Sequence, residues 1–307
     1  MIGESARITF IRNYIEQAAG FNAHVLITGE TGTGKDLVAE MLHSKSARAN
    51  KPFITFNCAA MPDSLFESEL FGHEKGVFTG ADAKHDGLFV AANGGTMFLD
   101  EIGEMSPHTQ AKILRVLETK QIQRLGTARP HPIDVRIVAA TNQNLEELVR
   151  HGHFRRDLYY RLNVARIHLP PLRERKEDIP HLIGHFIHMF NGQMGRHVVG
   201  VDMNLHDSLL DYEWPGNVRE LRNVLEATFL IVQSSMIRFG DLPSDYQKIF
   251  SQTRGTPCLE RERLISTLLA TNWNKSKAAK QLHWSRMTVY RKMAKYSIGQ
   301  STVKISA

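Results

Sequence analysis

A glycine-rich segment near the start of this 307-residue sequence has the residue types and spacing to bind the phosphates of a nucleotide. It follows an apolar run over 25–28 and precedes a helix-like run over 37–43, so its backbone N–H groups can converge on a phosphate at a helix N-terminus. Its glycines permit close approach, and its lysine would neutralise the β- and γ-phosphates. The segment predicts a P-loop, with a simple glycine-rich turn as the alternative. Its residues are Gly29, Glu30, Thr31, Gly32, Thr33, Gly34, Lys35 and Asp36.

Two adjacent acidic residues, Asp100 and Glu101, come directly after an apolar run that begins at two glycines. Such a run predicts a buried parallel strand, whose carboxyl end would lie beside the P-loop. Asp36 stands where many P-loops have a Ser or Thr that ligates Mg²⁺, so we expect Asp100 to hold the metal. Glu101 could orient and deprotonate the attacking water. The pair favours hydrolysis over nucleotide storage, and the alternative is a solvated acidic turn.

Two further strand-like runs also end in polar residues. The run over 135–142 ends in Thr141 and Asn142, which are suited to sensing a γ-phosphate, and the run over 52–57 ends in Asn57, whose amide could hold Glu101 away from water. Four such strands separated by helical periods predict an α/β sheet with polar residues at its carboxyl edge.

The composition is that of a protein with more than one domain. Hydrophobic residues make up 42% of the sequence, and no apolar run approaches the length needed to span a bilayer, so we expect a cytoplasmic protein with no membrane partner. Cys58 and Cys258 lie far apart in no metal-ligand spacing, which indicates reduced thiols. The fifteen histidines lack the Cys or acidic partners of a metal site.

Positive charge is concentrated at the C-terminal end. Residues 260–307 hold ten Lys or Arg and two Glu, a net +8, so the remainder of this +6 chain carries −2. A compact basic segment on a near-neutral body indicates a module that binds a polyanion.

Two short helices are predicted within this basic segment, over 274–282 and 286–296, with Asn274 as an N-cap. Two helices joined by a short turn form a helix-turn-helix, and a solvated basic hairpin is the alternative. The start of the second helix would read base edges and its later basic residues would contact phosphates. The small core would contain Ala278, Ala279, Leu282, Trp284, Val289 and Met293. The expected DNA-binding residues are Arg286, Met287, Thr288, Tyr290 and Arg291, with Lys292 and Lys295 also facing phosphates.

From residue 1 to about 298, the chain resembles the bacterial enhancer-binding activators of sigma-54 RNA polymerase, which are AAA+ ATPases. The most specific segment, over 69–81, reads Glu-Leu-Phe-Gly-His-Glu-Lys-Gly-Val-Phe-Thr-Gly-Ala. In that family a Gly-Ala-Phe-Thr-Gly-Ala loop contacts the sigma factor, so the resemblance implies this role for Phe78 and Thr79. Val77 differs from the family's alanine, and a β-branched residue stiffens the loop.

The resemblance also implies roles for residues outside that loop. Asn57 resembles the residue that restrains the catalytic Glu101, Asn142 resembles sensor I, and Arg219 resembles sensor II. Arg155 and Arg161 match the arginines that reach into the ATP of a neighbouring subunit, which implies a homo- or hetero-oligomeric ring, expected to be a hexamer. Without the resemblance, each arginine could equally form a surface ion pair.

We expect four parts in the chain: an AAA+ α/β nucleotide-binding subdomain over 1–170, an AAA+ helical lid over 171–243, a linker over 244–258 and a Fis-type helix-turn-helix domain over 259–307. The predicted fold class is α/β, with a parallel sheet. Only 24 residues precede the first predicted strand. In this respect the chain resembles the short subgroup of phage-shock and Hrp activators, which other proteins control in trans.

The predicted function is a sigma-54-dependent activator that binds upstream double-stranded DNA and hydrolyses Mg²⁺-ATP to remodel the closed complex of sigma-54 RNA polymerase. A nucleotide-switched DNA-binding regulator is the first alternative, and Glu101 with the Phe78 loop counts against it. A protein-unfolding AAA+ subunit is the second, and the basic C-terminal module counts against it.

Overall fold

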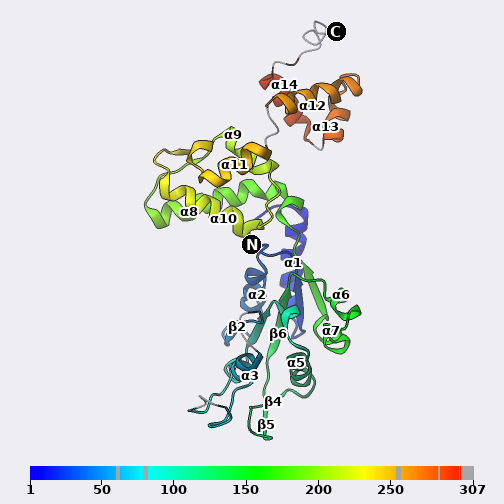
Figure 1. The fold of residues 1–307 in the computed structure, drawn as a ribbon, viewed down its shortest axis with the longest axis vertical. Helices are drawn as coiled ribbons and strands as arrows, with labels where there is room; N and C mark the ends of the chain where they lie inside the picture. Colours follow the sequence, from blue (N-terminus) through cyan, green and yellow to red (C-terminus); the bar gives the residue numbers. More distant parts are fainter. Residues whose placement is uncertain (60–62, 79–81, 254–256, 283, 297, 299–307) are drawn as a thin grey trace. The chain divides into compact units, whose positions relative to one another are not determined.

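The computed structural model describes residues 1–59, 63–78, 82–253, 257–282, 284–296 and 298. They form two compact units, residues 1–197 with 213–226, and residues 198–212 with 227–307. The first contains the predicted P-loop and sheet (Figure 1).

A five-stranded parallel sheet organises the first unit, in the order β2-β3-β6-β1-β7. Thr28 lies opposite Thr141 and Asn57 opposite Asp100, so the polar ends of neighbouring strands are level at one edge. The predicted α/β class with a parallel sheet is confirmed. The strands are β1 (Val25–Thr28), β2 (Phe53–Asn57), β3 (Thr96–Asp100), β6 (Arg136–Thr141) and β7 (Ala165–His168).

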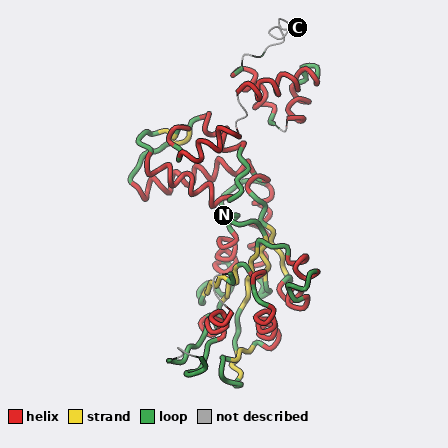
Figure 2. The backbone as a smooth tube through the Cα atoms, in the orientation of Figure 1, coloured by secondary structure: helices red, strands yellow, loops and turns green. Residues whose placement is uncertain are grey.

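Helices cover both faces of this sheet, because successive residues of its central strands point to opposite faces and are buried on both (Figures 1 and 2). Val25 and Ile27 of β1 pack with α1 and α2, whereas Leu26 faces the core that the other helices share. The two helices of the first face are α1 (Ala6–Ala19) and α2 (Lys35–Ser44). The opposite face is covered by α3 (Asp63–Phe71), α4 (Leu88–Ala91), α5 (Pro107–Thr119), α6 (Leu145–Arg150) and α7 (Arg156–Leu162).

The first unit contains further short elements around the sheet and the first helices of the expected lid. The first unit also contains η1 (Ile102–Glu104), the antiparallel pair β4 (Gln121–Gln123) and β5 (Pro130–Pro132), then η2 (Leu172–Glu174), η3 (Lys176–Asp178), α8 (Ile179–Met194) and the start of α10 (Asn217–Ile231).

The second unit begins with further lid elements, and one of them corrects the expected linker. They are β8 (Gly200–Val201), α9 (Met203–Asp211), β9 (Met236–Ile237), η4 (Phe239–Asp241) and α11 (Ser244–Thr253). Phe250 of α11 is 1% exposed, and its ring meets that of Tyr212 edge-on at 5.0 Å. The prediction of a linker was therefore wrong over 244–253, because Tyr246, Ile249 and Phe250 have the i, i+3, i+4 spacing of an amphipathic helix.

The last three helices of the described residues are α12 (Pro257–Ala270), α13 (Lys275–Leu282) and α14 (Arg286–Lys295). Both predicted helices are confirmed, and Asn274 Oδ1 accepts the N–H groups of Ser276 and Lys277 at 3.1 Å. The expected small core is present, and Leu264 and Leu268 of α12 complete it. Across the described stretches of the chain, every helix is too short or too polar to cross a membrane.

Candidate nucleotide-binding active site

The predicted P-loop connects β1 to α2, as the sequence required. Gly32 and Gly34 have φ angles of 79° and 100°, which favour glycine, and Gly34 directly precedes the N-terminus of α2. Lys35 is buried, and its Nζ donates to the carbonyl of Gly29 at 3.2 Å. The loop therefore presents a helix N-terminus and one lysine to an anion.

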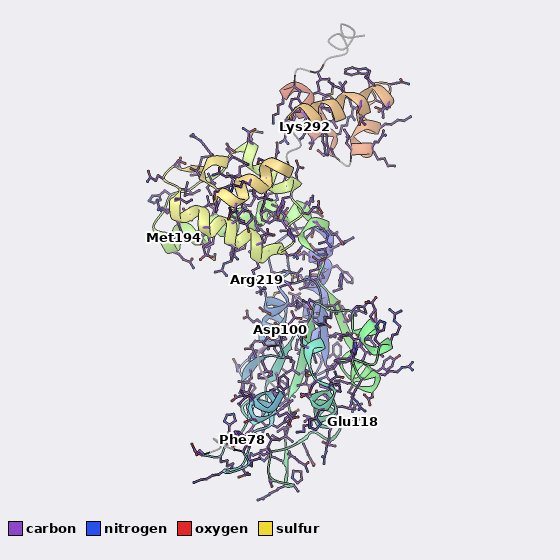
Figure 3. All side chains as sticks on the ribbon, in the orientation of Figure 1. Phe78, Asp100, Glu118, Met194, Arg219 and Lys292 are labelled. Atoms are coloured by element: carbon purple, nitrogen blue, oxygen red, sulfur yellow. The ribbon has the colours of Figure 1, made fainter. Side chains whose placement is uncertain are left out.

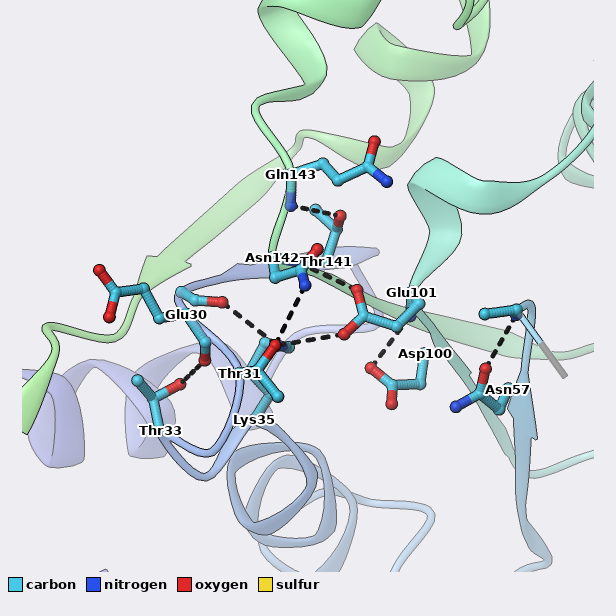
Figure 4. Close-up of polar contacts among 12 residues, drawn as sticks. Glu30, Thr31, Thr33, Lys35, Asn57, Asp100, Glu101, Thr141, Asn142 and Gln143 are labelled. Carbon is cyan, nitrogen blue, oxygen red and sulfur yellow. Dashed lines mark hydrogen bonds and ion pairs between the residues drawn. The ribbon is translucent and has the colours of Figure 1, made fainter. Parts of the chain in front are cut away.

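The two acidic residues lie at the carboxyl end of β3, beside the P-loop (Figure 4). Glu101 Oε1 is 3.5 Å from Lys35 Nζ, and Glu101 Oε2 accepts the backbone N–H of Asn142 at 3.1 Å. Asp100 Oδ1 accepts the N–H of Glu101 at 3.0 Å. Glu101 has a φ of 50°, which few non-glycine residues adopt. Contacts from β6 and the P-loop thus fix the orientation of its carboxylate.

The two amides predicted beside Glu101 have different partners. Asn142 Nδ2 donates to Thr31 Oγ1 at 3.1 Å, which connects the end of β6 to the P-loop. Asn57 Oδ1 accepts the N–H of Ala59 at 2.8 Å, a local bond, and the restraint of Glu101 by Asn57 stays a prediction (Figure 4).

A cavity of about 500 Å³ collects most of the predicted site residues. This volume is within the range of small-molecule sites. Lys35, Asp100 and Glu101 meet on its wall, and Arg219 reaches it from α10. Gly29, Glu30 and Asn142 are absent from its lining. The residues that line it are Met1, Ile2, Thr31, Gly32, Thr33, Gly34, Lys35, Asp36, Leu37, Asn57, Asp100, Glu101, Arg175, Leu182, His185, Phe186, Val218, Arg219, Arg222 and Asn223.

The electrostatics of this cavity suit a cation. Burial raises the pKa of Asp100, and the charges of Glu101 and Asp36 raise it further. Ionised carboxylates at this position therefore repel one another in the free protein. Oxygen ligands of this type bind Mg²⁺, so Asp36 and Asp100 fit the metal that accompanies ATP.

Replacing Asp100 with Asn should stabilise the nucleotide-free protein while removing Mg²⁺-dependent hydrolysis. An acid with a raised folded-state pKa contributes stability only while protonated, and this contribution is lost as the pH rises through that pKa. At pH 7 the variant should gain about 1 kcal/mol in the free energy of unfolding. Thermal unfolding should show the gain shrinking as the pH falls. Glu118→Gln, an exposed change on α5, is the control, and a pH-independent or negative effect of Asp100→Asn would contradict the assignment.

The two arginines expected to act between subunits lie away from this cavity. Arg155 directly precedes α7 and Arg161 lies within it, and both are exposed. Asp157 holds Arg155 in a two-bond ion pair, with Nη2 2.7 Å from Oδ2 and Nε 3.1 Å from Oδ1. Neither arginine lines the cavity of its own chain.

Sequence reasoning missed a set of residues that hold the P-loop from outside. Arg173 forms a two-bond ion pair with Glu30, at 2.6 and 2.8 Å, and the buried Arg175 donates to the carbonyl of Thr33 at 3.2 Å. Asn217 also bonds to this loop. The first two follow the proline pair after β7 and the third lies two residues before Arg219, so proximity to known motifs was the available signal.

The segment expected to contact the sigma factor lies beside the 124–126 segment that follows β4. The Glu74 N–H donates to the Leu125 carbonyl at 3.0 Å. Phe78 is 40% exposed, and its ring packs edge-on against that of His73 at 4.9 Å. Figure 3 shows Phe78 well away from Asp100. Thr79 lies outside the described residues.

The start of α14 exposes most of the residues expected to meet DNA. Met287 is 77% exposed, and Arg286, Tyr290 and Arg291 are exposed too, whereas Thr288 is half-buried beside the Ser285 cap.

One expected phosphate contact in this helix is wrong. Lys292 is only 7% exposed, and its Nζ lies 4.7 Å from the ring of Trp284, a cation–π contact that places it against the small core.

Three family descriptions match successive parts of the chain. The "Sigma-54 interaction domain" matches residues 1–168, the "AAA+ ATPase lid domain" residues 173–256, and the "Bacterial regulatory protein, Fis family" residues 258–296.

Two curated proteins and one solved structure are similar to this chain over nearly its whole length. The transcriptional regulatory protein ZraR of Salmonella typhimurium is 43% identical in an alignment of 304 positions that covers 96% of this chain and 68% of ZraR. The nitrogen fixation protein AnfA of Azotobacter vinelandii is 43% identical, over 97% of this chain and 57% of its own length. The structure of NtrX from Brucella abortus in complex with ATP has a TM-score of 0.78 and 32% identity, over 97% of this chain and 70% of NtrX.

The match of the sigma-54 interaction domain, the lid and the DNA-binding helices agrees with the P-loop, the paired acids and the parallel sheet. The chain belongs to the sigma-54-dependent transcriptional activators, AAA+ ATPases that bind ATP and act on sigma-54 and DNA.

Proposed function

We propose that the cavity binds Mg²⁺-ATP and that Lys35, Asp100 and Glu101 have separate roles in its hydrolysis. The observation that carries this proposal is their convergence on one cavity wall at the carboxyl edge of the sheet. Mg²⁺, when bound, would neutralise charge on the phosphates. Asp100, with Asp36 beside it, supplies oxygen ligands of the right type.

Glu101 is proposed as the general base. Its carboxylate forms an ion pair with Lys35 and accepts the N–H of Asn142 in this structure. A phosphate at the P-loop would compete for Lys35, because a doubly or triply charged anion attracts the ammonium more strongly than one carboxylate does. Glu101 would then turn toward a water and accept its proton. Asn142, bonded to Thr31, would report on the state of the loop, and Arg219 would complete the cavity from α10.

We propose a ring, expected to be a hexamer, in which Arg155 and Arg161 reach the ATP of the next subunit. Their exposure and their absence from the lining of their own cavity support this role. A bound phosphate would have to replace Asp157 as the partner of Arg155. That exchange favours the more highly charged anion.

Mixing two inactive variants tests the ring. Arg155→Ala and Lys35→Ala should each lower ATPase turnover at least about a hundredfold, because each loses a positive charge at the transferred phosphoryl group. A mixture should regain activity, since an intact Lys35 site can be next to an intact Arg155. Arg150→Ala, which removes an exposed arginine from α6, is the matched control and should retain full turnover. If no mixing ratio restores ATPase activity, the proposal that Arg155 acts in trans is contradicted.

We further propose that Phe78 and Thr79 contact sigma-54. On DNA, Arg286, Met287, Thr288 and Tyr290 would read base edges and Arg291 would contact phosphate. Because DNA and RNA polymerase are its partners, we propose a cytoplasmic location.

Transcription from a sigma-54 promoter with purified components should depend on both this chain and ATP. Transcription that is activated equally well with a non-hydrolysable ATP analogue would favour the nucleotide-switched regulator.

A further inference from the structure

The buried side chain of Asn217, one of the residues that hold the P-loop from outside, connects three segments of the first unit. Its Nδ2 donates to the carbonyl of Thr31 at 3.0 Å and to the carboxylate of Glu30 at 3.2 Å. Its Oδ1 accepts the N–H of Leu172 at 2.7 Å. The residue is 0% exposed, so no water replaces these partners. The amide therefore joins the P-loop to the segment after β7 and to the start of α10.

The backbone at Asn217 has a conformation that its surroundings must maintain. Its φ is 52°, and the preceding buried Trp214 has a φ of 50°. Non-glycine residues rarely adopt this region, and asparagine tolerates it better than most. The Asn217 N–H donates to the Trp214 carbonyl at 2.8 Å and closes the turn. Strain of this kind persists only where tertiary contacts fix the position.

The first turn of α10 also touches the P-loop through its backbone. The N–H of Arg219 donates to the carbonyl of Gly32 at 3.2 Å. A Cβ on Gly32 would lie 2.3 Å from the carbonyl oxygen of Gly216, so only glycine permits this approach. Two successive carbonyls of the P-loop, those of Thr31 and Gly32, are thus bonded to the start of α10.

These bonds set the direction of a P-loop donor. In a trans peptide the C=O and the following N–H point in opposite directions. Since Asn217 holds the Thr31 carbonyl, the N–H of Gly32 points away from Asn217, where it is available to a phosphate. The same contact fixes the helix end from which Arg219 reaches the cavity.

We propose that Asn217 is a positioning residue that joins the P-loop and the Arg219-bearing start of α10 into one nucleotide-binding unit. This inference rests on the proposed ATP site. Without the amide, the Thr31 carbonyl loses its partner and the Thr31–Gly32 peptide can turn, while Arg219 loses its fixed place relative to the loop. The consequence is weaker ATP binding, with less effect on turnover once ATP saturates the site.

Asn217→Gly in the full chain tests this role. Glycine accepts the positive φ, so the backbone is tolerated while all three side-chain bonds are lost. We expect the KM for ATP, and the Kd of a fluorescent ATP analogue, to rise at least about tenfold, with kcat changing less than about threefold. The stabilisation that ATP gives in thermal unfolding should shrink in parallel.

Two controls separate positioning from a loss of stability. Asn272→Gly makes the same change at an asparagine with a φ of 50° in the turn between α12 and α13. Leu221→Ala opens space at a fully buried position of α10. Both should leave the KM within about twofold, although Leu221→Ala lowers the Tm.

The outcomes distinguish this inference from the function on which it rests. If the wild-type protein hydrolyses ATP, either of two results would overturn the positioning role alone. One is a rise in KM for Leu221→Ala as large as that for Asn217→Gly, and the other is an unchanged KM for Asn217→Gly. Wild-type protein that neither binds nor hydrolyses ATP would overturn the proposed site and this inference with it.

Discussion

Glu101→Gln is expected to lower the turnover of ATP hydrolysis by about a hundredfold or more, the usual loss when a general base is removed. The change keeps the size of the side chain and its bond from the Asn142 N–H, but a neutral amide cannot accept the proton of water. Mg²⁺-ATP binding should remain, because Lys35 loses a competing carboxylate. Steady-state hydrolysis and nucleotide titration measure the two effects separately.

Glu104→Gln is the matched control for this variant. Glu104 lies three residues further along in η1, bonds to Gln143, and does not line the cavity. Its turnover should stay close to that of wild type. Equal losses in both variants would mean that charge in this region, and not a base at residue 101, supports hydrolysis.

Thr79→Ala is expected to separate ATP hydrolysis from transcription. If the loop transmits hydrolysis to sigma-54, its contact belongs to particular nucleotide states, and changing it leaves the distant ATP cavity intact. We expect at least about half of the ATPase rate, a loss well below the 1.4 kcal/mol that marks a tenfold effect, with nearly all open-complex formation lost. Phe78→Ala should behave in the same way. ATPase turnover and sigma-54-dependent transcription are measured on the same preparations.

Two variants of the same loop act as controls. Lys75→Ala removes an exposed charge outside the Gly-Val-Phe-Thr-Gly-Ala segment and should preserve both activities. Val77→Ala should also be tolerated, since it restores the residue that the family usually has. Val77 packs against Gly126, but it is partly exposed, so little burial is lost. Proportional losses of hydrolysis and transcription in Thr79→Ala would show that the loop is not the coupling element.

Features encoded by short-range spacing could be predicted from the sequence. The P-loop, the strand before Asp100 and the two helices around Trp284 each depend on residues within about one element, and glycines, caps and apolar periods specify them locally. The level carboxyl edge followed because parallel strands of one sheet end together.

Features that depend on distant partners could not be predicted. The place of Asn217 is decided by Thr31 and Leu172, which lie far from it in the sequence. Lys292 resembles any basic helix residue until the ring of Trp284 is seen beneath it. The bond that Asn57 Oδ1 accepts from the nearby N–H of Ala59 was also not foreseen, and the restraint of Glu101 by Asn57 stays a prediction. Helix α11 was missed for a different reason, because its polar residues concealed a short apolar period.

Open-complex formation at a sigma-54 promoter, followed by permanganate footprinting with purified polymerase, tests the central claim most directly. The account predicts promoter melting with wild-type protein and ATP, and none with Glu101→Gln and ATP or with wild-type protein and a non-hydrolysable ATP analogue. Melting under either of the last two conditions would show that nucleotide binding alone suffices and would contradict the account.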